Sequence, residues 1–460
     1  MALLSQPIQA LLQSVKSRHA ETPQEFDFDV VIVGSGYGGS VAACRLSALR
    51  KANEESLKVC VLERGREYQP GEFPEDITRL WPHVQVDSAV GAIGRRDALF
   101  DVRGNHGVSV LVGCALGGTS QINANVVLRP DRNVFEKTVS EPTGVARPVW
   151  PTALRNVSTL KPYFEKVEEM LEAQPFPSDP SEPLPKLRAL ERLSFFLRQA
   201  DDQPVTFERP PIAVQFKDGD NRSGVAQKKC SNCGNCCTGC NGRAKNTLTM
   251  NYLAVAHRQG AELYTQALVT RIAEDPKVRG AWLIYLEPNQ PRGPSEGIFV
   301  RAANVILAAG VLGTNEILLR STRPSEKSDI APLSLSGRLG RRFSCNGDSV
   351  NAGYDHIDFV HASQLNSSAR VGPCITGMIK VRPNNGQIAD DLGAAFNLFF
   401  RPFRMVKIQI NPFFNIRQLQ NVFNAVVRAI VDEVQHELVI AHPKLAETPQ
   451  AGAGIHQIVE

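Results

Sequence analysis

The chain has 460 residues, with 51 lysines and arginines against 47 aspartates and glutamates, so its net charge is only +4. The basic residues form no block, which disfavours a nucleic-acid partner. The longest apolar runs fall far short of the roughly 20 residues that cross a bilayer, so no transmembrane segment is expected. This length predicts two or three domains and a core large enough to bury an elongated cofactor.

Cysteine usage and the N-terminus suggest a cellular location. The first twenty residues have apolar positions at helical spacing but no basic start and no cleavage site, which disfavours secretion. Half of the ten cysteines lie between Cys230 and Cys240, whereas an extracellular disulfide framework would disperse them. A reducing, cytoplasmic location is therefore expected.

Residues 28–63 have the pattern of a strand, a glycine turn, a helix and a second strand. The strands are predicted at 28–33 and 57–62, and the helix is expected to extend to about Asn53. In the turn, Gly34 allows a tight bend, Gly36 lets the backbone approach a pyrophosphate, and Gly39 permits close helix packing. The helix N-terminus adds amides and a positive dipole end. The segment predicts a dinucleotide site.

Glu63 follows the second strand, 27 residues after Gly36. An acidic residue at this place accepts a hydrogen bond from a ribose hydroxyl, usually roughly 20 residues on, and a longer helix explains the difference. Plain turns also use glycines, but both strands and the acidic end are present here. The glycine motif alone leaves FAD and NAD open.

Two later segments are rich in small residues. In the stretch from Gly113 to Arg129, consecutive small residues offer amides for diphosphate and flavin oxygens, and Asn123 is a candidate polar contact near the ring. A glycine-rich connector is the alternative interpretation. Residues 304–309 predict a buried strand that ends at Gly310.

The segments 113–129 and 307–320 resemble flavin-contacting signatures of the glucose-methanol-choline (GMC) oxidoreductases and occur in that family's order. More local strings are similar to its cholesterol-oxidase-like branch: GSGYGGSVAACRL at 34–46, AKNTLTMNYL at 244–253, LGRRFSCNGD at 339–348 and GPCITG at 372–377. The resemblance covers about residues 28–380. It favours FAD over NAD.

The resemblance implies an α/β fold, α+β overall, with a Rossmann-like FAD-binding domain and a second, sheet-containing substrate domain. The expected division is an N-terminal extension (1–25), the FAD-binding domain in two parts (26–150 and 241–345), a substrate-side insertion with the cysteine loop (151–240), and the substrate domain with a divergent tail (346–460). Residues 174–225 are expected to be mainly surface loops. An amphipathic helix is expected around 419–434.

The predicted FAD contacts come from five stretches of the chain and are mostly glycines and small or polar residues: Gly34, Ser35, Gly36, Gly38, Gly39, Glu63, Gly117, Gly118, Ser120, Asn123, Val269, Ala309 and Gly310. Val269 is carried over from the family's adenine-facing strand, and a core valine is the alternative. His106 lies in a loop before Asn123 and is another candidate near the flavin.

The activity implied by the resemblance is oxidation of an alcohol, sterol-like or otherwise apolar, by hydride transfer to the flavin. The family's base is a histidine in a His-Pro-Gly-like loop, followed by an Asn-Pro step. Here His442-Pro443 lacks the glycine and Asn411-Pro412 precedes it, so the catalytic residues stay unassigned. The alternative is a flavin-binding protein that is catalytically incomplete or needs a partner chain. The electron acceptor is unknown.

The cysteines at 230, 233, 236 and 240 have the spacing of a ferredoxin run, with Asn241 in place of the usual proline. In such a run the fourth cysteine serves another cluster, so a remote ligand or a three-iron form would be needed. Tetrahedral zinc on Cys230, Cys233, Cys236 and Cys240 is the competing metal hypothesis. Packed or paired thiols are the third alternative.

Overall fold

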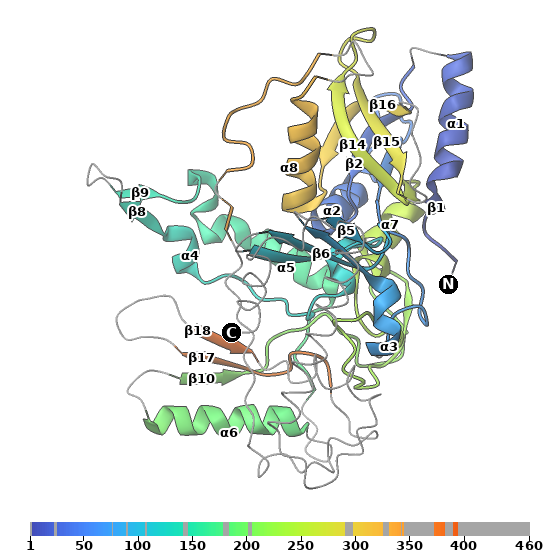
Figure 1. Cartoon of the computed structure of the whole chain (residues 1–460). Coiled ribbons are helices and arrows are strands. Elements are labelled where there is room, and N and C mark those ends of the chain that lie inside the picture. Colours follow the sequence, from blue (N-terminus) through green and yellow to red (C-terminus); the bar gives the residue numbers. More distant parts are fainter. Residues whose placement is uncertain are drawn as a thin grey trace, which may run out of the picture.

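A seven-stranded sheet is the largest sheet among the described residues of the computed structural model (Figure 1). The structure describes residues 2–324, apart from 23–24, 76, 89–90, 106–107, 141–145, 178–183, 201–204 and 290–297, together with residues 331–341, 343–344, 372–381 and 390–393. The strand order is β1 (Gln6–Pro7), β13 (Glu262–Thr265), β3 (Val59–Leu62), β2 (Phe28–Val33), β16 (Phe299–Leu307), β15 (Trp282–Pro288) and β14 (Ala267–Glu274).

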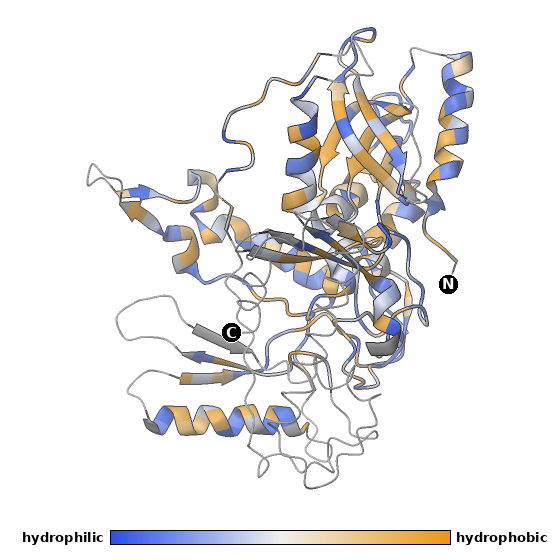
Figure 2. Cartoon of the chain, viewed as in Figure 1, coloured by the Kyte–Doolittle hydropathy of each residue, from blue (hydrophilic) through white to orange (hydrophobic). Residues whose placement is uncertain are grey.

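The strands β13, β3, β2 and β16 are parallel, with Val30 opposite Val59 between β2 and β3 and Asn304 opposite Val30 between β16 and β2. β2 is almost continuously apolar, as is typical of a parallel strand covered on both faces. Figure 2 shows apolar residues concentrated along the strands of this sheet.

Helices cover both faces of the parallel strands. On one face, α2 (Tyr37–Leu46) and α7 (Tyr252–Arg258) share a core with alternate residues of β2 and β3. On the other face, α1 (Ile8–Glu21), α8 (Gly310–Ser321) and the β14–β15 hairpin share a second core. This arrangement confirms the α/β, Rossmann-like prediction. Among the described residues, no helix is long and apolar enough to span a membrane.

The helix after the glycine turn is shorter than predicted, because α2 ends at Leu46 rather than near Asn53. The amide of Lys51 donates to the carbonyl of Glu55, and Glu54 has a positive φ of 66°, so a tight turn replaces the last helical turns. The polar residues 51–56 fit the outside of a helix and the outside of a turn equally well.

The expectation of surface loops in residues 174–225 is wrong where a helix and a strand form. This region contains the helix α6 (Pro185–Ala200) and the strand β10 (Val205–Glu208), which joins β17 (Met378–Val381) and β18 (Asp390–Gly393) in an antiparallel sheet. Leu190 of α6 packs with Val205 and Ile379. The prolines and charged residues on either side of α6 obscured the apolar face of this helix in the sequence. The expected domain boundaries stay predictions. The expectation that the second sheet belongs to a substrate domain also stays a prediction.

A four-stranded sheet leads into the glycine-rich segment, in the order β5 (Gly91–Ile93), β4 (Val84–Ser88), β6 (Phe100–Asn105) and β7 (Val108–Gly113). The remaining helices are α3 (Ile77–Leu80), α4 (Arg132–Glu136) and α5 (Val157–Leu171), with short 3-10 turns at Trp81–His83, Gly118–Gln121, Thr152–Leu154 and Leu248–Met250. The remaining strands form two pairs, β8 (Thr138–Ser140) with β9 (Ala146–Pro148) and β11 (Gly219–Asp220) with β12 (Ala226–Gln227).

Candidate functional site

The glycine turn joins β2 to α2 where side chains have no room. Gly34 has φ +97°, and a Cβ there would lie 2.4 Å from the carbonyl oxygen of Ala308. A Cβ on Gly39 would lie 1.9 Å from the carbonyl oxygen of Gly34. Gly36 is different, because no described atom lies within 4 Å of a Cβ built on it. The backbone at Gly36 therefore faces open space, next to helix amides that have no intrahelical acceptor.

Glu63 and Ser35 connect the glycine turn to two other backbone segments. The buried Glu63 carboxylate accepts bonds from the Ser35 amide (3.1 Å), the Ser35 hydroxyl (2.6 Å) and the Gly65 amide (2.8 Å). The Ser35 Oγ also accepts a 2.9 Å bond from the amide of Gly117. Each Glu63 oxygen has lone pairs for more than one donor, so the carboxylate keeps capacity for a ligand hydroxyl.

The loop at 117–123 lies against the glycine turn. Gly117 and Gly118 have φ values of +90° and +55°, and a Cβ on Gly118 would lie 3.0 Å from Cα of Gly36. The buried Ser120 hydroxyl donates to the carbonyl of Gly117 at 2.7 Å and accepts from the amide of Leu248 at 3.2 Å. Two segments that are 82 residues apart in sequence thus meet through their backbones.

Asn123 ends this loop, and its Nδ2 donates to the Tyr37 hydroxyl at 2.8 Å. Its Oδ1 accepts from the amide of Asn125 at 3.3 Å. The Asn125 side chain was not predicted as a site residue, but it is 2% exposed and neither of its polar atoms has a hydrogen-bond partner among the described residues. Buried polar groups rarely stay unbonded in native proteins, so a bound molecule is a natural partner. Its position two residues after Asn123 was the only signal for it in the sequence.

The turn from β16 into α8 lies beside the glycine turn. The amide of Ala308 donates to the carbonyl of Val33 at 2.8 Å, and Ala309 is the N-cap of α8. Gly310 has φ +71° and no described atom within 4 Å of a built Cβ. A second helix N-terminus therefore begins at the same edge of the sheet. The backbone around Gly38 is also uncrowded, since its nearest contact would be at 3.9 Å.

Val269 lies in β14 and is 4% exposed within the core shared by α1 and α8. Its strand starts next to the acidic end of β3, since the Ala267 amide donates to the carbonyl of Glu63 at 2.8 Å. An adenine-facing backbone and a core side chain are compatible at this position. The role of Val269 stays a prediction.

Lys245 joins the 117–123 loop to the cysteine loop at 230–240. Its buried ammonium donates to the carbonyls of Gln121 (3.0 Å), Asn123 (2.8 Å) and Cys236 (2.9 Å). Burial lowers the pKa of Lys245 below its ordinary value. The string at 244–253 contains this lysine, but the sequence gives no sign that Lys245 holds two loops together.

The four cysteines of the ferredoxin-like run line one small cavity, together with Lys245. Backbone amides approach two of the sulfurs at 3.4 Å, from Asn232 to Cys230 and from both Ala244 and Lys245 to Cys240. Burial raises the pKa of Cys230 to about 12. The cavity thus gathers four cysteines, and burial favours the neutral thiol at Cys230.

This cavity measures about 20 Å³, roughly the room of one water molecule. No group of three or more His, Cys, Asp or Glu side chains in the described part of the chain is arranged to hold a metal ion. An iron–sulfur cluster does not fit this arrangement unless the loop opens. The observed geometry favours packed thiols.

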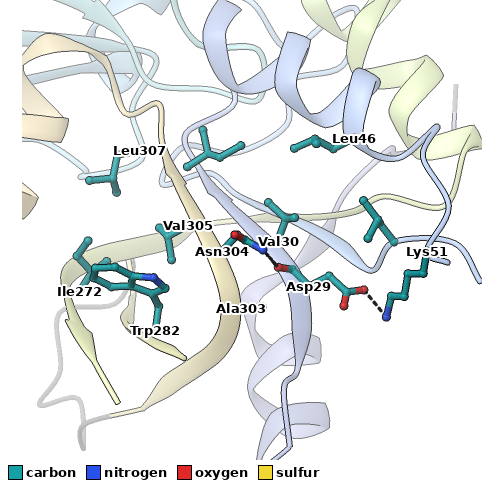
Figure 3. A pocket seen from close by; sticks show the side chains of 12 residues that line it. Asp29, Val30, Leu46, Lys51, Ile272, Trp282, Ala303, Asn304, Val305 and Leu307 are labelled. Atoms are coloured by element: carbon teal, nitrogen blue, oxygen red, sulfur yellow. Dashed lines mark hydrogen bonds and ion pairs between the residues drawn. The ribbon is translucent and has the colours of Figure 1, made fainter. Parts of the chain in front are cut away.

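A separate pocket of about 630 Å³ is lined by residues of the neighbouring strands β16 and β2, by Ile272 and Trp282, and by Leu46, Lys51 and Leu57 (Figure 3). Its lining is mainly apolar and includes Ile272, Trp282 and residues 303–307. Lys51 and Asp29 form an ion pair of 2.8 Å at its rim. None of the predicted FAD contacts lines it, so this pocket is not the dinucleotide site.

Several predicted features lie outside the described residues. They are His106, the Asn411-Pro412 and His442-Pro443 steps, the helix expected at 419–434 and the end of the 339–348 string. The assignment of a catalytic base therefore stays open.

The parallel sheet, the glycine turn and the acidic residue after the neighbouring strand define a Rossmann-like dinucleotide-binding protein. A family model described as GMC oxidoreductase matches residues 210–345. The cholesterol oxidase of Acinetobacter baumannii is 28% identical over 349 residues, which are 72% of this chain and 56% of that protein. The cholesterol oxidase of Mycobacterium tuberculosis (strain H37Rv) is 27% identical over 344 residues, 70% and 52% of the two chains.

The chain is similar to the GMC oxidoreductases over residues 210–345 and to a cholesterol oxidase over 72% of its length. This confirms the resemblance seen in the sequence, and FAD is the cofactor that the family indicates. The chain spans about half the length of the curated relatives it matches.

Proposed function

We propose that this chain binds FAD and oxidises a CH–OH group, with hydride passing from an alcohol to the flavin. The observation that carries the proposal is the open backbone at Gly36, flanked by Gly118 and by the Ser35–Glu63–Gly117 hydrogen bonds. An anionic diphosphate needs such unobstructed amides at a helix N-terminus.

The residues fit an elongated dinucleotide. In this proposal, the amides of the α2 N-terminus and of Gly117–Gly118 bind the diphosphate, and Glu63 accepts from a ribose hydroxyl. Val269 faces the adenine, while Asn123 and the Ala309–Gly310 turn lie beside the flavin. Bound FAD would supply a two-electron acceptor for hydride. The unbonded amide of Asn125 supports a ligand near this loop.

The substrate class follows from the similarity to cholesterol oxidases, and we infer a small-molecule alcohol that is apolar, with a sterol as one member of the class. Alcohol oxidation also needs a group that removes the hydroxyl proton, typically worth about 10²–10⁴-fold in rate. No described residue is assigned to that task.

A visible spectrum of the purified protein tests cofactor binding. Flavin absorption that survives gel filtration is expected, and a colourless protein that takes up no added FAD after refolding would contradict the proposal. Anaerobic addition of cholesterol or a simple aliphatic alcohol tests the reaction, since hydride transfer bleaches the oxidised flavin.

The alternative is a flavin-binding protein that is catalytically incomplete or needs a partner chain. It is distinguished by a flavin that binds and can be reduced by dithionite, but is not bleached by any alcohol. Its support is the absence of a recognisable His and Asn pair in the family's order.

Oxygen consumption during turnover would identify oxygen as the electron acceptor.

An iron–sulfur cluster at Cys230, Cys233, Cys236 and Cys240 stays a proposal that is supported by the spacing and by the amides near two sulfurs. It requires the cavity to enlarge. Iron and acid-labile sulfide in protein purified without oxygen would establish it, and their absence would leave the thiols structural. No step of the proposed oxidation depends on it.

A further inference from the structure

Two cysteines outside the ferredoxin-like spacing are in contact. The Sγ atoms of Cys237 and Cys374 lie 3.2 Å apart, although the residues are 137 positions apart in the chain. A disulfide bond is about 2.05 Å long, so a closing movement of roughly 1.2 Å would join them. Movements of this size are within the reach of side-chain and loop adjustment.

The backbone on both sides holds the two thiols in place. Cys237 lies in a turn of the cysteine loop, which is tied by the Thr238 amide to the carbonyl of Asn235 at 3.1 Å. On the other side, the Gly372 amide donates to the carbonyl of Asn232 at 3.0 Å. The buried Lys186 of α6 donates to the carbonyl of Cys374 at 3.1 Å. The contact is therefore fixed by bonds that do not involve the sulfurs.

The two thiols differ in exposure. Cys374 is fully buried, whereas Cys237 is partly exposed. An oxidant from solvent would reach Cys237 first, and Cys374 would then be the nearby thiol that resolves the oxidised form. Cys236 also contacts Cys374 but is only 8% exposed, so it is a poorer first target.

We propose that Cys237 and Cys374 form a reversible disulfide when the protein meets hydrogen peroxide. In the first step the sulfur of Cys237 attacks a peroxide oxygen, which gives a sulfenic acid and one water molecule. In the second step the sulfur of Cys374 attacks the Cys237 sulfur, which forms the S–S bond and releases a second water. The two thiols lose two protons and two electrons, and one peroxide becomes two waters.

The bond would connect two parts of the molecule. Cys374 lies just before β17, and the sheet that contains β17 packs on α6. The cysteine loop, in turn, is held to the 117–123 loop through Lys245. A disulfide would therefore tie the segment before β17 to the cysteine loop, and through Lys245 to the 117–123 loop. This inference is independent of the proposed alcohol oxidation.

The experiment treats the full chain with a small excess of hydrogen peroxide, blocks the remaining thiols by alkylation and maps the peptides by mass spectrometry. We expect a Cys237–Cys374 cross-linked peptide, two fewer free thiols, and full reversal by dithiothreitol. The oxidised protein should also have a Tm about 5 °C or more above the reduced protein, because the bond closes a long loop.

Cys237→Ser and Cys374→Ser should each abolish the cross-link and the Tm rise, whereas the matched control Cys236→Ser should retain both. A wild-type cross-link that joins Cys374 to Cys236, or oxidation of Cys237 to sulfinic acid without a cross-link, would overturn the proposal. The mapping uses wild-type protein, so the result stands even where a variant folds poorly.

Discussion

The glycine turn at 34–39 and the cysteine loop at 230–240 are both short connectors, but different forces shape them. In the glycine turn, close backbone contacts exclude side chains, and the free face at Gly36 is a property of the backbone. In the cysteine loop, buried side chains determine the arrangement: thiols around a small cavity and a lysine bonded to three carbonyls. Both connectors have partners far away in the sequence, but the glycine turn meets them mainly through its backbone, whereas the cysteine loop meets them through side chains.

Substitutions in the glycine turn should have the largest effect on stability and on FAD binding. They test whether the close contacts at Gly39 and the open backbone at Gly36 can be changed independently of each other. In Gly39→Ala the new Cβ would meet the Gly34 carbonyl at 1.9 Å, so the backbone must shift. We expect a loss of about 3 kcal/mol or more in the free energy of unfolding, measured by urea denaturation.

Gly36→Ala is the matched control, because its Cβ meets no described atom. The apo protein should keep its Tm, while FAD binding measured by fluorescence titration should weaken at least about 10-fold, or about 1.4 kcal/mol. Unchanged FAD affinity in Gly36→Ala would show that the open face is not the diphosphate site.

On the cysteine side, the buried Lys186 should make stability depend on pH. Burial lowers the pKa of Lys186 to about 8, below its value in the unfolded chain. Between pH 8 and about 10.4 the unfolded chain binds a proton that the folded chain does not. The free energy of unfolding therefore increases with rising pH, by up to about 3 kcal/mol.

Urea denaturation of wild type and Lys186→Met across this pH range gives the free energy of unfolding of each protein. The difference between the two isolates the contribution of Lys186, because the other titrating groups are the same in both proteins. The exposed Lys161→Met on α5 is the control and should run parallel to wild type. Parallel curves for wild type and Lys186→Met would mean that the lysine stays charged beside the Cys374 carbonyl.

Ser35→Ala sharpens the comparison by removing a side chain from the backbone-dominated site. The change deletes the bond to Glu63 and leaves the Gly117 amide without its acceptor, so about 2 kcal/mol of unfolding free energy should be lost. Ser17→Ala, on the exposed side of α1, should be nearly neutral in the same urea series. A neutral Ser35→Ala would show that water replaces the hydroxyl.

The smallest effect is expected from Tyr37→Phe. Tyr37 is 44% exposed and accepts one bond from Asn123, so its loss should change stability by less than about 0.5 kcal/mol. FAD affinity should change less than in Asn123→Ala, if Asn123 contacts the flavin as proposed. The reverse order in a titration of both variants would place the tyrosine, rather than the asparagine, next to the ligand.

The sequence by itself determined the strand, glycine turn, strand and Glu63, because these elements are adjacent in the chain and each glycine acts through its own backbone. Family-like strings extended this to the 113–129 and 307–320 segments. The same approach overestimated the length of α2 and missed α6, since polar residues suit an exposed helix face and a surface turn alike.

Only the tertiary structure decided what these segments contact. The crowding of Gly34 comes from Ala308, the hydroxyl of Ser35 bridges to Gly117, and Cys374 reaches Cys237 across 137 residues. Such contacts leave no periodic trace in a sequence, because burial and hydrogen bonding between distant segments depend on how the sheets and helices pack. The ferredoxin-like spacing shows the same limit: spacing fixes which thiols are near in the chain, while packing decides whether they surround a cavity large enough for a cluster.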